Sequence, residues 1–342
     1  MLKSLSSALL VAIAAMIALP SCHSTEQWDN DPYGNFDALW TTIDRHYCYL
    51  DDKQVDWNAL YDIYRARLRP DMTERELFTV LSDLLANLRD GHTNLASPFD
   101  VFYYRSWWSD YPQNYSARLV EQYYLNFSWL TASGIIYGTL PDNIGYLRVA
   151  SFSSGMGQGN IDYVLHYLQS CSALIIDIRD NGGGDLTNVE KLVSRFISEP
   201  ILAGYIIHKT GPGHDEFSEP YAYHIDPAPQ GYQRWGKPVA VLTNRSTFSA
   251  ANDFTSIMSR LPQVKIVGST TGGGGAMPFN SMLPNGWSVR FSASPLLTPA
   301  MQSTENGIDP TPGCEVDLDA EQALLGIDTM IDRAAQILLS GN

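Results

Sequence analysis

The stretch ALIIDIRDNGGGDLTNV, residues 173–189, decides the fold class. Its first half is a run of apolar and β-branched residues, which is typical of a strand buried on both faces of a sheet. Three glycines (182–184) follow at once, and the pattern after them indicates a helix. A buried strand, a glycine turn and a helix in this order predict one unit of an α/β layer.

The same alternation continues on both sides of this unit. Further apolar runs predict strands at 144–152, 201–209, 238–244, 264–269 and 287–294. Helical patterns occur at 159–170, 185–198, 249–260 and 319–339. We therefore expect residues 141–342 to form an α/β core with a mostly buried sheet.

A different pattern precedes the core. Residues 36–89 carry apolar residues at helical spacing, and Thr73 followed by Glu76 predicts a capping box at one helix start. We expect a helical region at 36–97. Residues 98–140 are rich in aromatic residues without clear periodicity, so we expect a connector with short strands there.

Composition excludes several classes of protein. The 342 residues carry a net charge of −15 with no cluster of Lys or Arg, which argues against a nucleic-acid partner. Apart from Cys22, the cysteines are Cys48, Cys171 and Cys314, an odd number without CxxC spacing, so neither a disulfide framework nor a zinc site is indicated. His208, His214 and His224 match no common zinc motif. We expect no metal and no organic cofactor.

The N-terminus has the pattern of an export signal. Residues 8–19 form a twelve-residue apolar run, too short to span a bilayer of about 30 Å. The run ends in LPSC, so that residues 1–21 resemble a bacterial lipoprotein signal with Cys22 as the lipidated residue and 22–35 as a tether. An ordinary signal peptide with an incidental cysteine is the alternative. Either way we expect export, and with lipidation a membrane-anchored protein of the cell envelope, periplasmic or surface-exposed.

The stretch TNRSTFSAANDF, residues 243–254, places three hydroxyls at a predicted helix start. A serine there commonly caps the helix. The same position suits a nucleophile, because amides at a helix start can stabilise an oxyanion. The residues of this stretch alone leave both interpretations open for Ser246, Thr247 and Ser249.

Six blocks in one order decide between these interpretations. They are DGHTNL (90–95), GYLRVASF (145–152), ALIIDIRDNGGG (173–184), VAVLTNRSTFSAANDF (239–254), IVGSTTGGG (266–274) and ENGIDPT (305–311). Together they resemble the tail-specific (C-terminal processing) and tricorn-core serine peptidases. The resemblance implies a crotonase-like ββα core, Ser249 as the nucleophile, and an oxyanion hole formed by the amides of Gly183 and Ala250.

The base follows from a departure within that family. One branch uses a lysine in a GKG-like loop, but the corresponding loop here reads TTGGGGAMP and has no lysine. The tricorn-like branch uses a histidine from a DGH block, supported by an acidic residue. The resemblance therefore implies His92 as the base and Glu305 as its support, directly or through a hydroxyl such as that of Thr93 or Ser246. A neutral imidazole has a suitable pKa for this role. A helix-capping His92 and a solvated Glu305 are the structural alternatives.

The resemblance implies a serine endopeptidase that acts on peptide or protein substrates, and the N-terminal signal adds a lipid anchor to this expectation. Only about 50 residues separate DGHTNL from GYLRVASF, too few for the PDZ module that many relatives carry. The aromatic residues Trp107, Trp108 and Tyr111 are candidates to line the substrate cleft, or simply to pack. Two alternative functions stay open: an inactive binding protein for peptides or apolar ligands on the same scaffold, and an acyl-thioester enzyme of crotonase type, against which export argues.

Overall fold

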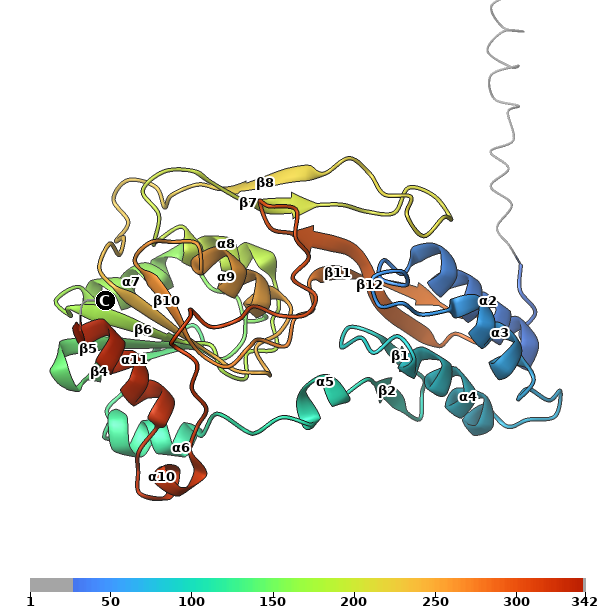
Figure 1. Ribbon diagram of the computed structural model, residues 1–342, viewed down its shortest axis with the longest axis horizontal. Helices are drawn as coiled ribbons and strands as arrows, with labels where there is room; N and C mark the ends of the chain where they lie inside the picture. The colour runs from blue at the N-terminus through green and yellow to red at the C-terminus, as the bar shows by residue number, and fades with distance from the viewer. Residues whose placement is uncertain (1–26, 341–342) are drawn as a thin grey trace, which may run out of the picture.

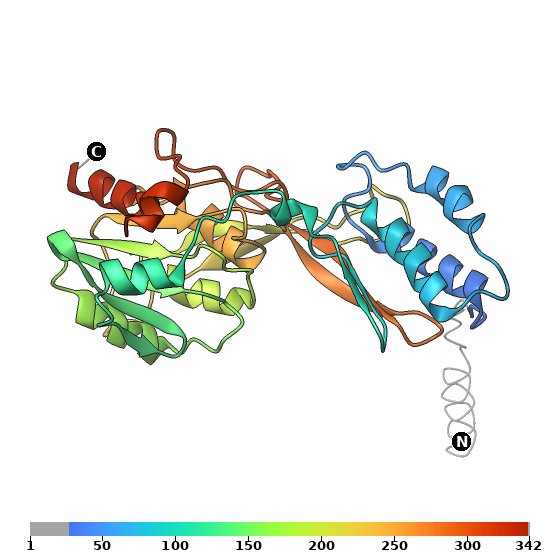
Figure 2. The same cartoon turned by 90° about the horizontal axis from the view of Figure 1, so that it is seen from below.

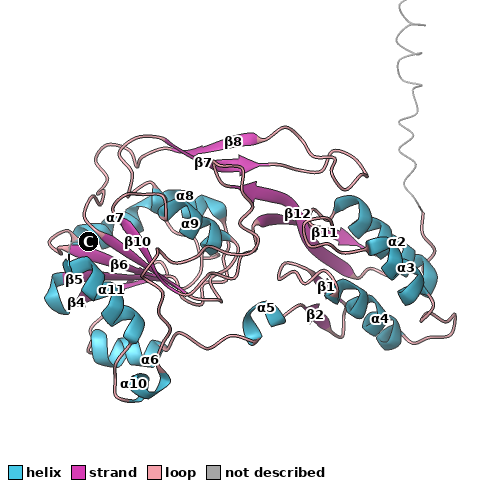
Figure 3. Ribbon diagram, viewed as in Figure 1, coloured by secondary structure: helices cyan, strands magenta, loops and turns pink. Residues whose placement is uncertain are grey.

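Two sheets in two lobes organise the chain in the computed structural model, which describes residues 27–340 (Figure 1). The larger lobe contains the α/β core, and the smaller one contains the N-terminal helices. Figure 3 shows the division of helices and strands between them. Cys22, the predicted site of lipidation, lies outside the described residues. Within them, no helix is long and apolar enough to cross a membrane.

The core sheet has the strand order β10-β9-β6-β5-β4-β3. Four of its strands are parallel, and β3 and β4 extend the sheet antiparallel at one edge. The strands are β3 (Leu130–Ala132), β4 (Ile135–Leu140), β5 (Ile144–Val149), β6 (Ala173–Asp177), β9 (Val239–Thr243) and β10 (Val264–Gly268). Every residue of β5, β6 and β9 is buried, as the continuous apolar runs predict.

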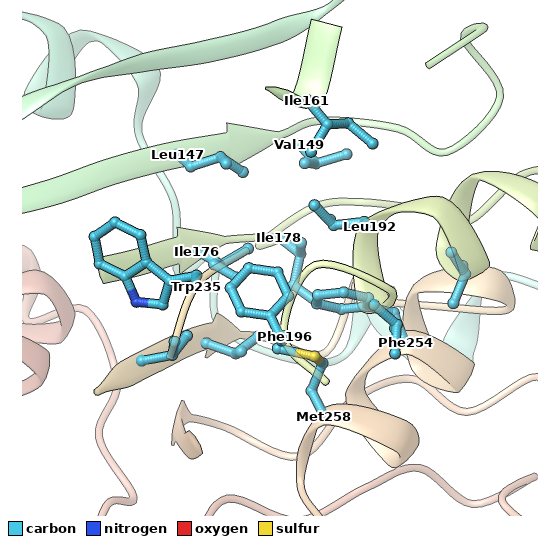
Figure 4. Packing of buried hydrophobic residues seen from close by; sticks show 14 of the residues in the cluster. Leu147, Val149, Ile161, Ile176, Ile178, Leu192, Phe196, Trp235, Phe254 and Met258 are labelled. Atoms are coloured by element: carbon cyan, nitrogen blue, oxygen red, sulfur yellow. The ribbon is translucent and has the colours of Figure 1, made fainter. Parts of the chain in front are cut away.

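Helices cover both faces of this sheet. One face packs against α7 (Gln158–Leu168), α8 (Leu186–Val193) and α9 (Ala250–Met258), and Figure 4 shows the apolar side chains between them. The other face packs against α11 (Thr329–Ser340) and the turn Val120–Tyr124, which follows α6 (Ala117–Leu119). The short helix α10 (Ala320–Leu324) precedes α11. The predicted α/β class is confirmed.

The N-terminal lobe combines three helices with strands from both ends of the chain. Its helices are α2 (Pro32–His46), α3 (Trp57–Arg65) and α4 (Glu74–Ala86). The capping box at the start of α4 is present: the Thr73 hydroxyl accepts from the Glu76 amide, and the Glu76 carboxylate accepts from the Thr73 amide. The strands β1 (Asn94–Ala96) and β2 (Val101–Tyr103) follow.

A long hairpin leaves the core and completes this lobe. Strands β11 (Ala276–Met282) and β12 (Ser288–Leu297) pair with each other, and β12 continues the sheet to β1, with Asn94 opposite Arg290. Trp287 and Phe291 of the hairpin pack into the apolar cluster of the N-terminal helices. The sequence analysis placed residues 141–342 in one core and did not predict that β11 and β12 extend into the N-terminal lobe.

The other end of β12 pairs with β7 (Ile201–Ile206), and β7 pairs with β8 (Tyr221–Ile225). This sheet therefore joins the two lobes. A second connection is the segment after β2, which contains α5 (Ser106–Ser109) and runs between the lobes before it enters the core (Figure 2). The expected connector at 98–140 thus contributes β3 and β4 to the core sheet itself.

Candidate active site

Ser249 lies between the end of β9 and the start of α9. Its backbone has φ 57° and ψ −121°, an unusual conformation for a residue with a side chain. The Ser249 amide donates to the Gly273 carbonyl over 2.8 Å, and the Phe248 amide donates to the Asn181 carbonyl over 2.9 Å. These bonds hold the strained turn from both sides. The Ser249 hydroxyl does not cap the helix, contrary to the simpler interpretation of a serine there.

His92 brings its ring to this hydroxyl from the other lobe. It lies in the turn between α4 and β1, and its Nε2 is 2.9 Å from the Ser249 Oγ. The Asp90 carboxylate accepts from the His92 amide over 2.7 Å and fixes that turn. The ring packs against Phe248, with ring centroids 4.7 Å apart. The structure therefore brings together two residues that are 157 positions apart, as the resemblance implies.

Burial keeps the His92 ring neutral. It lowers the pKa of His92 to about 4; Asp90 opposes this shift, and the positive charges of Arg290 and Lys53 add to it. A neutral ring can accept the serine proton at Nε2 when its own proton is on Nδ1. The Nδ1 atom is buried and has no hydrogen-bond partner in the described part of the chain.

The other two hydroxyls of the stretch have different surroundings. Thr247 is buried, accepts from the Asn244 amide and donates to the Ile178 carbonyl. Ser246 lines a surface hollow beside the site. Ser249 alone of the three has the histidine as its partner.

The predicted oxyanion residues lie next to Ser249. A side chain on Gly183 would come within 2.8 Å of the Ser249 Cβ and 2.9 Å of the Ala250 nitrogen, so only glycine fits there. Ala250 is the first helical residue, so no carbonyl within α9 can accept from its N–H. The Gly183 N–H, however, donates to the Asn181 Oδ1 over 2.9 Å. Gly183 can serve an oxyanion only if this bond is broken or shared.

The Glu305 carboxylate forms its hydrogen bond and ion pair with groups other than His92, in contrast to the expected direct support. One of its oxygens lies 2.7 Å from the Lys53 Nζ, and the other accepts from the Gly275 amide over 2.9 Å. Neither suggested hydroxyl bridges the two side chains: among residues 27–340 that of Thr93 is buried without a hydrogen-bond partner, and Ser246 lines the hollow. A buried ammonium group is a stronger partner for a carboxylate than a neutral imidazole, which explains this arrangement.

Lys53 is the site residue that the sequence analysis missed. It follows α2 and reaches Glu305 at 2.7 Å and Asp90 at 3.7 Å, so one cation serves two carboxylates. Burial and the Asp90 charge raise the pKa of Glu305 to about 7, although Lys53 opposes this shift. For Asp90, burial opposes ionisation, but the charge of Lys53 and the hydrogen bond from the His92 amide hold the pKa below its usual value. Lys53 lies in the acidic stretch DDKQVD, and nothing in that stretch indicates such a role.

The side chain of Asn252 connects the loops around the nucleophile. Its side chain donates to the Thr304 carbonyl over 3.1 Å and accepts from the Thr271 hydroxyl over 2.6 Å. Thr304 directly precedes Glu305, and Thr271 starts the glycine loop that contacts Ser249. α9 therefore fixes both the serine and the loop that carries Glu305.

A hollow of about 580 Å³ adjoins the site. It is lined by Trp107, Trp108 and Tyr111, which were candidates for this position, and by residues of the two loops that carry Gly183 and Ser249. Trp107 also stacks on Phe248 at 4.2 Å. The aromatic connector thus borders the site directly.

His208, His214 and His224 do not form a cluster that could bind a metal ion. His214 lies 3.0 Å from Asp44 and 3.3 Å from Asp51, across the junction with α2. Across residues 27–340, no group of three or more His, Cys, Asp or Glu side chains is placed to hold a metal ion.

A strained serine at a strand–helix turn, bonded to a buried neutral histidine, defines a nucleophilic site of the hydrolase type. Comparisons with known proteins agree. The family model for peptidase family S41 matches residues 143–312, and the tricorn protease C1 domain matches residues 29–86. A crystal structure of a putative peptidase from Parabacteroides merdae is 44% identical, covers 91% of this chain and 98% of that chain, and has a TM-score of 0.86.

More distant relatives extend the same result. The carboxy-terminal processing protease CtpB of Bacillus subtilis is 24% identical over 175 residues, which are 49% of this chain but only 33% of that protein. The structure of mature CPAF complexed with lactacystin is 13% identical with a TM-score of 0.68, over 91% of this chain and 99% of that chain, and shares the fold. The chain therefore belongs to the S41 family of serine peptidases, and the predicted resemblance is confirmed.

Proposed function

We propose that this protein hydrolyses peptide bonds through an acyl-enzyme on Ser249. The observation that carries the proposal is the contact of 2.9 Å between the Ser249 Oγ and the His92 Nε2. A serine hydroxyl is a weak nucleophile at neutral pH, and a neutral imidazole within hydrogen-bond reach activates it. Both residues are held in place by their backbones, so the pair is already assembled.

The reaction has two halves. The Ser249 Oγ attacks the substrate carbonyl while His92 Nε2 takes the hydroxyl proton, and the protonated ring then gives that proton to the leaving amine. Water repeats the attack on the acyl-enzyme, again with His92 as the base, and releases Ser249. No other reactant is needed to balance these steps.

Two backbone amides and one carboxylate stabilise the charges that form. The Ala250 N–H, at the start of α9, donates to the developing oxyanion, and the Gly183 N–H joins it once it leaves the Asn181 side chain. Asp90, which already favours the charged form of His92, stabilises the imidazolium. Glu305 acts one step further away: it holds Lys53 and the Gly275 amide, and so positions the glycine loop beside the serine.

An inactive binding protein on the same scaffold is the second candidate. The structure offers an aromatic hollow that a binding protein could use, but a decayed site has no need for a strained serine with an assembled base. Hydrolysis of an unfolded protein by the purified domain separates the two. We expect cleavage that Ser249→Ala abolishes and that Ser259→Ala, at the exposed far end of α9, leaves unchanged. Absence of cleavage by the unaltered protein on all substrates, or cleavage that survives Ser249→Ala, contradicts the proposal.

We further propose that Cys22 is lipidated and that the protein acts as an endopeptidase at the cell envelope. The support is the apolar run at 8–19 that ends in LPSC. Expression in a bacterium fed a labelled fatty acid tests this. We expect the label in the membrane fraction and its loss in Cys22→Ala; a soluble, unlabelled protein contradicts the anchor and leaves the chemistry of the site untouched.

A further inference from the structure

The hollow beside the site has the chemistry of a recognition pocket. Two of its lining residues belong to the loops that carry the proposed catalytic residues. Gly182 precedes Gly183, and Ser246 lies three residues before Ser249. Trp107, which also lines the hollow, stacks on Phe248, and Phe248 packs on the His92 ring. A substrate whose carbonyl reaches Ser249 therefore has a neighbouring side chain within reach of the hollow.

The wall formed by Trp107 is built into the fold. A side chain on Gly91 would come within 2.7 Å of the Trp107 Nε1, and one on Gly272 would collide with the same indole. The Arg245 Nε donates to the Trp107 carbonyl over 2.6 Å. The loops of both lobes thus leave space for this indole and hold it there.

The remaining walls present aromatic surface and one carboxylate. Trp108 and Tyr111 are 43% and 49% exposed, so part of each ring is open to a ligand. Asp180 is also exposed, in the turn after β6. Its amide donates to the Asn244 Oδ1 over 2.9 Å, and its Oδ1 accepts from the Asn244 Nδ2 over 2.7 Å. This pair of bonds fixes the direction of the carboxylate.

Both kinds of wall favour a cation. Aromatic faces attract ammonium and guanidinium groups, and a carboxylate forms charge-assisted hydrogen bonds with them. Among the described residues, those that line the hollow include no Lys or Arg. We propose that the hollow binds a basic side chain of the substrate, arginine or lysine, with its stem on the Trp108 and Tyr111 rings and its charged end at Asp180. This inference rests on the proposed function and names its substrate class.

One cation close to the hollow has to be taken into account. The Arg245 guanidinium lies over the Tyr111 ring at 4.5 Å. Two of its nitrogens already donate to backbone carbonyls, those of Trp107 and Thr271. Arg245 therefore supports the wall, while Asp180 is the charged side chain that lines the hollow itself.

Binding to the Ser249→Ala variant tests the inference without catalysis. The probes are fluorescent hexapeptides that contain either arginine or citrulline, its neutral isostere, at one position, with that position scanned along the peptide. We expect one register in which arginine binds about tenfold more tightly than citrulline, the factor of a single charge-assisted hydrogen bond. The ratio should fall to about one in the Ser249→Ala, Asp180→Asn double variant. Asp62→Asn, the same charge change on the exposed face of α3, should leave it intact.

Other outcomes overturn the inference. Equal binding of arginine and citrulline in every register, or a preference that survives Asp180→Asn, excludes Asp180 as the recognition group. Tighter binding of a leucine peptide than of the arginine peptide makes the hollow an apolar pocket instead. These results do not affect the proposed function, because cleavage that depends on Ser249 is measured in a separate assay. Conversely, failure of the cleavage assay would contradict the proposed function without changing the ratio of arginine to citrulline binding.

Discussion

We expect the buried carboxyl of Glu305 to make the free energy of unfolding depend on pH. Its carboxylate is mostly buried beside Asp90, which raises its pKa from the ordinary value of 4.5 to about 7. Because the folded state holds the proton more tightly than the unfolded state, this group favours folding fully below pH 4.5. The advantage is lost as the pH rises through about 7. At about 1.4 kcal/mol per pH unit, the loss amounts to about 3 kcal/mol.

The variant Glu305→Gln removes this titration. Glutamine keeps the shape and can still accept from the Gly275 amide, so the change is chiefly one of charge. We measure the free energy of unfolding in urea, by tryptophan fluorescence, from pH 4.5 to 8. All other groups titrate in both proteins, so their effect largely cancels in the difference between variant and unaltered protein. The variant lacks the ion pair with Lys53 at every pH, and the pH dependence of the difference is therefore the quantity to compare.

We expect this difference to move in favour of the variant by about 3 kcal/mol between pH 4.5 and 8. The exposed Glu219→Gln is the matched control, because water solvates its carboxylate in both states. A difference that stays constant over the range would refute the reasoning. It would mean that Glu305 is solvated and that the cluster with Lys53 and Asp90 does not form.

Three further predictions follow from the same geometry. The acid limb of kcat/KM should lie near pH 4 rather than 6.5, because burial lowers the pKa of His92; a limb at 6.5 in a pH profile would show an exposed ring. Lys53→Met should lower the free energy of unfolding, measured in urea at pH 8, by about 3 kcal/mol, because methionine leaves two buried carboxylates unpaired. Lys53→Arg should lower it by less, and equal losses in the two variants would contradict an ionic role. Gly183→Ala should lower kcat about 100-fold or more, because its methyl group meets the Ser249 Cβ, while Gly182→Ala, with open space around it, should fold with unchanged stability. Comparable stability and kcat for the unaltered protein and Gly183→Ala would exclude the close approach.

The elements of the core could be predicted because their signals are local. Continuous apolar runs mark β5, β6 and β9, and the capping box of Thr73 and Glu76 marks the start of α4. The extension of β11 and β12 into the N-terminal lobe could not be predicted from such local signals. A hairpin pattern indicates that two strands pair, but it does not indicate which distant strand they join, and β1 lies nearly 200 residues away.

The same division applies to the site. Ser249 and His92 were found through motif order, and their contact then follows from the fold. The assignment of Glu305 to His92 was transferred from the family pattern, and the structure places Lys53 at this carboxylate instead. No local signal connects Lys53 with Glu305. The hydrogen bond from the Gly183 amide to the Asn181 side chain, by contrast, is local. An asparagine side chain often accepts from the amide two residues further along the chain, so the sequence NGG predicts this turn.

Reaction of Ser249 with a fluorophosphonate tests the central claim most directly. The reagent modifies activated serine hydroxyls and leaves ordinary ones unmodified, and peptide mass spectrometry locates the adduct. We predict one adduct on Ser249, lost in Ser249→Ala, strongly slowed in His92→Ala, and retained in Ser246→Ala. No adduct, an adduct on another residue, or equal rates with and without His92 would contradict the account.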